Sequence, residues 1–575
     1  MRNFVFGILT GFLFLALTVV IFAVALVRLA SRPVSVPNNA VLVVRLTGDV
    51  PERPGVTPPV PIPFIGGAQS ATVRDYWDLF RKAAADKRVR AMVVQPDGLA
   101  SGWGKLYELR SGIEKFRASG KPVYAWLRSP NTRDYYVASA ADRIYMAPEG
   151  ALDLKGMRFE MTYIRGGLDK LGVDVIIEHA GKYKDAPEAY TRTGPSQPSL
   201  EMTNSLLDGL FGQLTETIAR ARNKTPEEIR SIIDQGPFLA GQAQGAGLVD
   251  ELKYEDEVFE AMHKRLGIAK PPHIAAADYM KVTPDSAGIA ARSRIAFVAA
   301  SGSIVQSASD DLFGDGLGFI SASEMRPLLK QIREDRGIKG VILRIDSPGG
   351  DSFASDQIWH DVRLLAKQKP VVVSMSDSAA SGGYYIAMCG GPVVAYPGTF
   401  TGSIGVFYGK ANLRGLYNKL GITKEIISRG RFADIDSNYA PLTPAGREKL
   451  ASIVQETYQT FLQRVADGRN MEVAQVEPVA QGRVWLGSQA RENGLVDELG
   501  GIDAAVELVK EKAKIARSEQ VRLIGYPARK SFLEWLTRRS SEPAGDILGK
   551  LRSISTAQWL RGSYFYLTPY ILEVK

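Results

Sequence analysis

The chain has 575 residues, of which 45% are hydrophobic, and this length and composition allow it to bury two sizeable cores. Its formal net charge is +9, but the 71 lysines and arginines are scattered among 62 acidic residues without a long basic run, which argues against a nucleic-acid partner. The single cysteine, Cys389, rules out an intrachain disulfide and offers no metal-ligand spacing, so we expect a small buried side chain there, no metal and no cofactor.

The amino-terminal segment predicts a membrane anchor. Residues 4–27 are almost uniformly apolar, and 24 such residues are enough for a helix that spans a bilayer. A cleaved signal peptide has a shorter apolar region, so we favour an uncleaved transmembrane helix within residues 1–30, although the triplet Ala23-Val-Ala25 leaves cleavage open. Arg2 favours a cytoplasmic start, and two arginines beyond the segment oppose it. The remainder should be a water-soluble body held at one face of the membrane.

Strand and helix patterns alternate after the anchor. Residues 51–63 carry six prolines and should form an extended surface arm. Short apolar runs then alternate with helical patterns, which predicts βαβ units and an α/β fold with mainly parallel sheets. The predicted strands are residues 40–46, 89–94, 123–126, 341–345 and 371–375; the predicted helices are residues 105–119, 135–141, 201–221, 354–367, 444–466 and a segment from about residue 383. The tail from residue 533 is amphipathic and aromatic, which suits either docking on the body or contact with the membrane.

The chain repeats itself at an offset close to 249 residues. Tyr135-Tyr-Val-Ala138 returns as Tyr384-Tyr-Ile-Ala387, and Gly247-Leu-Val-Asp-Glu-Leu252 returns as Gly494-Leu-Val-Asp-Glu-Leu499. Independent matches at nearly one offset indicate a duplicated domain. We therefore expect two tandem copies, and the predicted domains are residues 1–30 for the anchor, 31–290 and 291–530 for the repeats, and 531–575 for the tail.

The two copies differ where chemistry would occur. Ser381 and the two glycines after it face Thr132-Arg133-Asp134 of the first copy, which lacks the serine. Conversely, Lys184 of the first copy faces Ala433 of the second. Each copy keeps what the other has lost, which favours one site split between the repeats. Two decayed copies without chemistry remain the alternative.

Four motifs together resemble one peptidase family. They are Gly181-Lys-Tyr-Lys-Asp185, Ser347-Pro-Gly-Gly350, Ala379-Ala-Ser-Gly-Gly383 and Thr401-Gly-Ser-Ile-Gly405. With the anchor and the duplication, they resemble the long form of the signal peptide peptidase A (protease IV) family, peptidase family S49. The resemblance implies a Clp protease/crotonase-like fold in each repeat and cleavage of hydrophobic signal peptides. It also implies a ring-shaped homotetramer on the bacterial inner (cytoplasmic) membrane, with the catalytic body facing the periplasm.

The resemblance assigns the nucleophile to Ser381 and the general base to Lys184. A serine hydroxyl is a poor nucleophile until a base takes its proton. None of the four histidines belongs to a motif shared with Ser381, so a Ser-Lys dyad is favoured over a Ser-His-Asp triad. Lys184 would have to be desolvated, because a lysine of ordinary pKa is protonated at neutral pH. Lys182 is the competing candidate, and we expect it to be solvated; His179 precedes the motif and should have a surface or supporting role.

The tetrahedral intermediate needs donors aimed at its oxyanion. Gly382 can present its backbone N–H at the start of a helix, and Gly349 or Gly350 can supply a second donor, since a glycine pair permits unusual dihedral angles. By the resemblance, the hydroxyl of Ser403 orients the lysine amine.

Two aspartates flank these segments. Asp346 and Asp377 have no ligand partners in the sequence pattern and suggest no metal. Three functions remain open: a membrane-anchored Ser-Lys endopeptidase, a crotonase-type acyl-CoA enzyme, and a catalytically inactive membrane scaffold. The anchor together with both dyad residues favours the endopeptidase. The cleavage preference, the number of subunits and the question of whether the dyad forms within one chain stay open at this point.

Overall fold

The computed structural model describes residues 35–54, 71–307, 318–528 and 563–567, with isolated positions 11, 14 and 18 near the amino terminus. Apart from those three positions, the predicted anchor in residues 1–30 lies outside the described residues, as does most of the proline-rich arm. Among the described residues, no helix is both long and apolar enough to cross a membrane.

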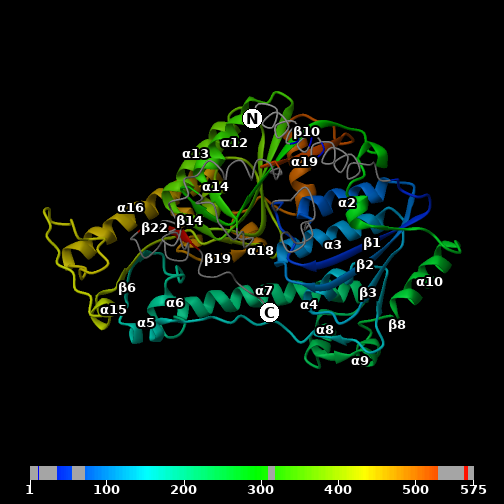
Figure 1. The fold of residues 1–575 in the computed structure, drawn as a ribbon, viewed down its shortest axis with the longest axis horizontal. Helices are drawn as coiled ribbons and strands as arrows, with labels where there is room; N and C mark the ends of the chain where they lie inside the picture. Colours follow the sequence, from blue (N-terminus) through cyan, green and yellow to red (C-terminus); the bar gives the residue numbers. More distant parts are fainter. Residues whose placement is uncertain are drawn as a thin grey trace.

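A six-stranded, fully parallel sheet forms the centre of the amino-terminal repeat (Figure 1). Its order is β8-β4-β3-β2-β1-β9, and its strands are almost continuously apolar, as expected for a parallel sheet covered on both faces. The strands are β1 (Ala40–Gly48), β2 (Val89–Leu99), β3 (Val123–Leu127), β4 (Arg143–Met146), β8 (Glu251–Leu252) and β9 (His273–Ala275). The helices of this repeat are α2 (Val73–Ala85), α3 (Trp103–Ala118), α4 (Thr132–Ala138), α8 (Pro226–Ile233), α9 (Ala240–Gly245), α10 (Glu255–Leu266) and α11 (Ala276–Tyr279). The predicted strands and helices of this half are confirmed, with ends that differ by a few residues.

A second sheet forms the centre of the carboxy-terminal repeat. It has the order β19-β17-β15-β13-β10-β21, with β16 and β20 attached beside β15, and only the pairing of β17 with β19 is antiparallel. Its strands are β10 (Ala291–Ser301), β13 (Ile338–Ser347), β15 (Val371–Ala380), β16 (Val393–Ala395), β17 (Phe400–Gly402), β19 (Val484–Leu486), β20 (Glu498–Leu499) and β21 (Gln520–Tyr526). Its helices are α12 (Ala322–Glu334), α13 (Ser352–Ala366), α14 (Gly382–Ala387), α17 (Val473–Val476), α18 (Gly487–Glu492) and α19 (Ile502–Lys512). The mainly parallel α/β architecture predicted from the sequence is therefore confirmed.

A third sheet joins the two repeats and the tail. Its order is β12-β11-β14-β22-β18-β6, in which β6 belongs to the first repeat and β22 to the tail. The strands are β6 (Asp174–Ala180), β11 (Ser303–Val305), β12 (Phe319–Ser321), β14 (Gly349–Asp351), β18 (Val406–Asn412) and β22 (Ser563–Leu567). β6 runs antiparallel to β18 along its full length. This pairing carries the loop after β6 from one repeat into the other.

Two long helices, α7 (Gln197–Arg222) and α16 (Pro444–Arg469), repeat each other in length and caps. Both have 26 residues, a hydroxyl N-cap, proline in the first turn, and an asparagine C-cap in the left-handed conformation. In Figure 1, α7 runs from beside α6 (Glu188–Thr191) past β19 towards α4. The amide of Gln213 on α7 donates to Pro397 O and Ser488 Oγ of the second repeat. The repeats are thus packed together along α7, and one hydrophobic core contains residues from both.

Shorter elements complete the described chain. They are β5 (Ala151–Leu152), which pairs with β7 (Phe238–Leu239), the helices α5 (Arg165–Leu171) and α15 (Arg414–Lys419), and two 3₁₀ turns at Asp285–Ala287 and Glu477–Val479.

The first residues of the proline-rich arm are not a surface feature. Glu52 is only 4% exposed, and its carboxylate lies 2.7 Å from the guanidinium of the fully buried Arg344 on β13. The prediction of a surface arm is therefore wrong at this end of the segment, because a buried cation in the other repeat requires a partner.

Candidate active site

Ser381 lies at the sharp turn between β15 and α14. Its φ angle is +54°, a conformation that costs a non-glycine residue free energy and that clusters at active sites. The side chain is buried, and the backbone N–H donates to Gly402 O at 2.8 Å. The turn needs glycine at position 383, since a Cβ there would lie 2.8 Å from Ser347 O. The strand-to-helix turn therefore holds the hydroxyl at the carboxyl end of the parallel sheet.

Lys184 reaches Ser381 from the loop after β6. Its Nζ lies 2.7 Å from Ser381 Oγ, 3.0 Å from Ser403 Oγ and 3.1 Å from Ser403 O. The loop is held by a bond from Tyr183 N–H to Gln481 O and by close packing on Gly482, where a Cβ would lie 2.6 Å from Lys184 N. The structure thus brings both predicted dyad residues and Ser403 together within one chain.

The amine of Lys184 is in an environment that favours its neutral form. Burial lowers the pKa of Lys184 well below its ordinary value, although the neighbouring Asp185 opposes this shift. Burial also raises the pKa of Asp185 to about 7, and the hydroxyl of Ser199 donates to Asp185 Oδ2 at 2.5 Å. A neutral amine has two N–H groups and one lone pair, which match the two oxygens of Ser403 and the hydroxyl of Ser381. The arrangement is that of a lysine able to take the serine proton.

The predicted oxyanion glycines lie next to this pair. A Cβ on Gly382 would lie 3.1 Å from Gly350 N and 3.3 Å from Gly349 Cα, so the three glycines are packed together. The φ angles of Gly349 and Gly350 are +108° and +159°, which side-chain-bearing residues rarely adopt. Gly349 N–H donates to Ser347 Oγ at 3.1 Å, and that bond would have to be exchanged if Gly349 were the donor to an oxyanion.

The tail contributes a strand beside the same glycines. β22 pairs antiparallel with β14 on one side, where Gly350 faces Tyr566, and with β18 on the other, where Phe407 faces Phe565. Part of the tail therefore docks on the body, as one of the two sequence-based alternatives expected. It lies in an extended conformation across the sheet that carries Gly349 and Gly350.

Comparison with known proteins identifies the family. The sequence profile of peptidase family S49 matches residues 115–269 and 363–516, more than half of the chain and once in each repeat. The chain belongs to peptidase family S49. It is 36% identical over 450 residues to the chloroplastic serine protease SPPA of Arabidopsis thaliana, an alignment that covers 77% of this chain and 66% of that protein. It is also 32% identical to Protease 4 of Salmonella typhi over 78% of this chain and 73% of that protein. The enzyme is therefore a serine protease.

Two further matches of this S49 protease are shorter or weaker. A protein of Enterococcus faecium that bears the name signal peptide peptidase SppA is 37% identical over 32% of this chain and 55% of its own length. Among solved structures, a ClpP1 mutant from Listeria monocytogenes matches with a TM-score of 0.24 and 15% identity, covering 36% of this chain and 94% of that one. This similarity is too low to carry an argument, so the Clp protease/crotonase-like assignment stays a prediction.

The other residues of this S49 protease that the sequence offered as catalytic candidates do not belong to the dyad site. Lys182 is exposed, with its Nζ near the ring and hydroxyl of Tyr183, as expected of a solvated lysine. His179 is also exposed, on β6. Cys389 is buried among apolar side chains, which confirms the small-side-chain prediction. Among the described residues, no cluster of histidine, cysteine and carboxylate side chains could hold a metal ion.

Sequence reasoning assigned a role to Ser403 but none to three other residues around the lysine, namely Asp185, Ser199 and Gln481. Asp185 was visible inside its motif, whereas Ser199 lies in the first turn of α7, 14 residues later, and has no local signal. Gln481 holds the lysine loop through its backbone and side chain, and it lies almost 300 residues from that loop in sequence. Such partners become visible only when the third sheet forms.

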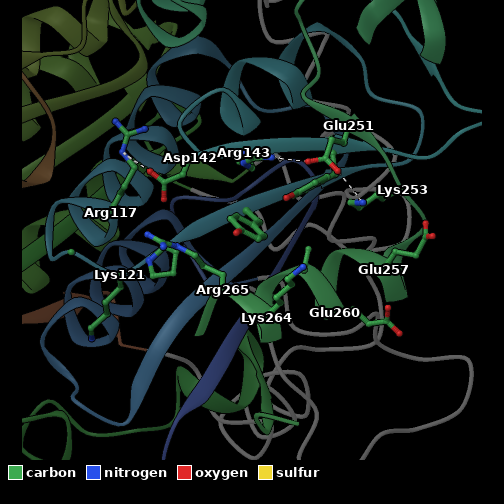
Figure 2. A pocket seen from close by; sticks show the side chains of 15 residues that line it. Arg117, Lys121, Asp142, Arg143, Glu251, Lys253, Glu257, Glu260, Lys264 and Arg265 are labelled. Carbon is green, nitrogen blue, oxygen red and sulfur yellow. Dashed lines mark hydrogen bonds and ion pairs between the residues drawn. The ribbon is translucent and has the colours of Figure 1, made fainter. Parts of the chain in front are cut away.

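A large open cavity lies apart from the dyad, at the edge of the first sheet (Figure 2). Its volume is about 1140 Å³, and neither dyad residue lines it. Its wall carries alternating charges, with Glu251 between Arg143 at 2.6 Å and Lys253 at 2.9 Å. These ion pairs satisfy one another at the surface, and the cavity has no part in the site described above.

Proposed function

We propose that this S49 protease is a membrane-anchored endopeptidase that uses Ser381 as nucleophile and Lys184 as general base. Its proposed substrates are cleaved signal peptides and other short hydrophobic peptides. The observation that carries the proposal is the 2.7 Å separation between Lys184 Nζ and Ser381 Oγ at a buried site. A serine–lysine pair performs the same chemistry as the serine triad, with the amine in the place of the imidazole.

The proposed reaction follows from this geometry. Ser381 Oγ attacks the carbonyl carbon of the peptide while its proton passes to the neutral amine of Lys184. The carbonyl oxygen becomes negative, and backbone N–H groups of Gly382 and of Gly349 or Gly350 stabilise it. The lysine ammonium then protonates the leaving amine, the C–N bond breaks, and the serine remains acylated. A water molecule gives a proton to Lys184 and attacks the acyl carbon, and the acid leaves as the proton returns to Ser381 Oγ.

An extended peptide is the substrate that fits this site. β22 occupies the position between β14 and β18 as an antiparallel strand, directly beside Gly349 and Gly350. A substrate that adds a strand in this position would bind through its backbone, which accommodates many sequences. The name of the Enterococcus faecium relative supports signal peptides as the substrate class.

The proposed location and assembly rest on the sequence. The apolar segment in residues 1–30 would anchor the chain in the bacterial inner membrane, with the body in the periplasm, close to signal peptides left after processing. A ring-shaped homotetramer is the proposed assembly.

The test is digestion of a synthetic signal peptide in detergent micelles by the full-length protein, with the products mapped by mass spectrometry. We expect cuts inside the hydrophobic segment, much slower cleavage of a charged peptide of equal length, and no cleavage by Ser381→Ala. Equal cleavage of both peptides would refute the substrate class, and activity in Ser381→Ala would refute the nucleophile.

The tail strand predicts competition with substrate. Proline has no N–H and disrupts a strand pairing, so Tyr566→Pro in β22 should weaken the docking of the tail and lower KM for a peptide substrate. A synthetic peptide of residues 559–570 added to this variant should raise the apparent KM again. Steady-state kinetics checks both, and an unchanged KM in Tyr566→Pro would show that β22 does not compete.

The pH dependence should report the amine of Lys184. Activity requires the neutral amine, so kcat/KM should rise with pH through the lowered pKa of Lys184. Asp185 raises that pKa when it is ionised, and its own pKa is raised to about 7. Asp185→Asn should therefore move the rising limb of the pH profile to lower pH. Asp174→Asn is the control, because Asp174 is exposed and lies on β6, the strand that leads into the loop of Asp185. A rising limb that moves to higher pH in Asp185→Asn would contradict the assignment.

A further inference from the structure

A bulge in β15 directs the chain towards Ser381. β13 and β15 pair in register as far as Ile345 with Met375, and the next pair is Ser347 with Ala379. One residue on β13 therefore faces three on β15, namely Ser376–Ser378. Bulges bend a strand and re-aim the side chains that follow, and Ser381 comes two residues after the pairing resumes. The conformation of this bulge thus sets the direction of the nucleophile.

The amino-terminal repeat holds this bulge through the start of α3. The Asp377 carboxylate accepts backbone N–H bonds from Gly102 at 3.1 Å and from Lys105 at 2.8 Å. The side-chain Nζ of Lys105 lies 3.2 Å from Asp346 Oδ2, 3.4 Å from Asp377 Oδ2 and 3.4 Å from Asp49 Oδ1. One lysine of the first repeat therefore joins the two strand ends of the second repeat from which the oxyanion loop and the nucleophile turn begin.

Lys105 is a cation in this position. Burial opposes its charge, but the carboxylates of Asp346, Asp377 and Asp49 raise its pKa well above the ordinary value. Asp346 also accepts from the backbone N–H of Ser378 at 3.2 Å, so its carboxylate contacts the bulge directly. Without the cation, two carboxylates would face each other across the two strands with little solvent to screen them.

The first repeat balances the charges at its own strand ends in a different way. There, Asp97 near the end of β2 pairs at 2.6 Å with Arg128, the residue directly after β3. The second repeat has two aspartates there and needs a cation from outside. It also has one more residue between its Lys369-Pro370 pair and its tyrosine pair than the first repeat has between Lys121-Pro122 and Tyr135.

We propose that Lys105 is a positioning residue of the reaction: from the first repeat, it balances Asp346 and Asp377 and so holds the bulge that aims Ser381. The amino-terminal repeat then contributes two residues to the reaction. Lys184 contacts the hydroxyl of Ser381, and Lys105 contacts the aspartates at the bulge before Ser381. The inference rests on the proposed role of Ser381, and it concerns kcat rather than substrate binding, because the buried Lys105 amine contacts the aspartates at the strand ends and not the strand position proposed for the peptide.

The test compares four full-length proteins by steady-state peptide hydrolysis, with active sites counted by a serine-directed phosphonate. Lys105→Met should lower kcat about 10- to 100-fold, since a small misplacement of a nucleophile has effects of this size, while KM stays within about twofold. The double variant Lys105→Met/Asp346→Asn, which restores the charge balance, should recover kcat to within about threefold of wild type. Lys115→Met is the matched control, because Lys115 lies on the same helix and pairs with Asp503 of the second repeat at 2.8 Å, away from the bulge.

A merely structural role predicts a different result. Lys105→Met would then lower the melting temperature but leave kcat per titrated site unchanged, and this outcome would overturn the proposal. A double variant as slow as Lys105→Met would overturn it too, because charge balance would not be the cause. If Lys105→Met does not fold, the double variant decides alone, since its kcat is expected near wild type. Failure of the proposed nucleophile is separate and would appear as activity in Ser381→Ala.

Discussion

Lys184→Met is expected to lower kcat roughly 10³- to 10⁴-fold, because it removes the base 2.7 Å from the Ser381 hydroxyl. Methionine is similar in length and apolar, so it should fill the buried site without a cavity. KM should change little, since the amine contacts the hydroxyl and Ser403 and not the strand position proposed for the peptide. Steady-state hydrolysis of a leucine- and alanine-rich fluorogenic peptide, with active sites counted separately, measures the effect.

The neighbouring Lys182→Met is the control for this variant, because Lys182 is exposed and differs from Lys184 by two positions. It should retain wild-type kcat. The double variant Ser381→Ala/Lys184→Met should be no slower than Ser381→Ala, since residues that act as a unit are not additive. Near-wild-type activity in Lys184→Met would show that another group takes the serine proton.

The same substitution should change stability in a pH-dependent way. The pKa of Lys184 is lower in the folded than in the unfolded protein, so the unfolded chain binds the proton more tightly. Wild-type stability is therefore lost as the pH falls from the unfolded pKa, near 10.5, towards the folded one. The Lys184→Met variant has no such titration. Its free energy of unfolding should therefore increase relative to that of the wild type as the pH is lowered through that window.

Gly350→Ala is expected to lower kcat roughly 10²- to 10³-fold, comparable to the loss of one oxyanion donor. An added Cβ at Gly350 would lie 2.1 Å from the backbone oxygen of Ile304, and the φ angle of +159° is one that alanine rarely adopts. The backbone of Ile304 cannot yield as a flexible side chain would, so β14 must move from its position against β11, and Gly350 with it. Kinetics with the fluorogenic peptide, together with a thermal melt, measures the loss in the folded protein.

Gly390→Ala separates this clash from backbone strain. Gly390 lies in the same repeat, has a φ angle of +90°, and has no heavy atom within 4 Å of an added Cβ. It should lose some stability, as alanine does at a positive φ, but keep its kcat. Equal loss of kcat in both variants would show that the effect does not arise from the position of β14.

Much of the fold could be predicted from local sequence patterns. β13 and β15 were visible as β-branched apolar runs because strands buried on both faces must be apolar along their whole length. The long helices α7 and α16 were predicted, but the prediction for α7 began at residue 201 and missed the Ser196 cap and the first turn. The bulge at Ser376–Ser378 was not visible, because Gly102 and Lys105, whose backbone N–H groups bind Asp377 within it, lie more than 270 residues away.

The individual residues of the site could be predicted from the sequence, but their arrangement in space could not. The loss of the serine in one copy and of the lysine in the other pointed to Ser381 and Lys184. The burial of Glu52 against Arg344 had no signal in the proline-rich segment, since the partner lies in the other repeat. The same holds for β22, whose position depends on two strands that are far from it in sequence.

Local sequence was enough to predict the duplication, the parallel sheets and the two dyad candidates. Strand patterns and repeated motifs depend on residues that are close together along the chain. The meeting of Lys184 with Ser381 within one chain depended on the pairing of β6 with β18, which no offset in the sequence predicts. The charge state of that lysine also depended on folding, because its lowered pKa comes from burial that exists only once both repeats have packed together.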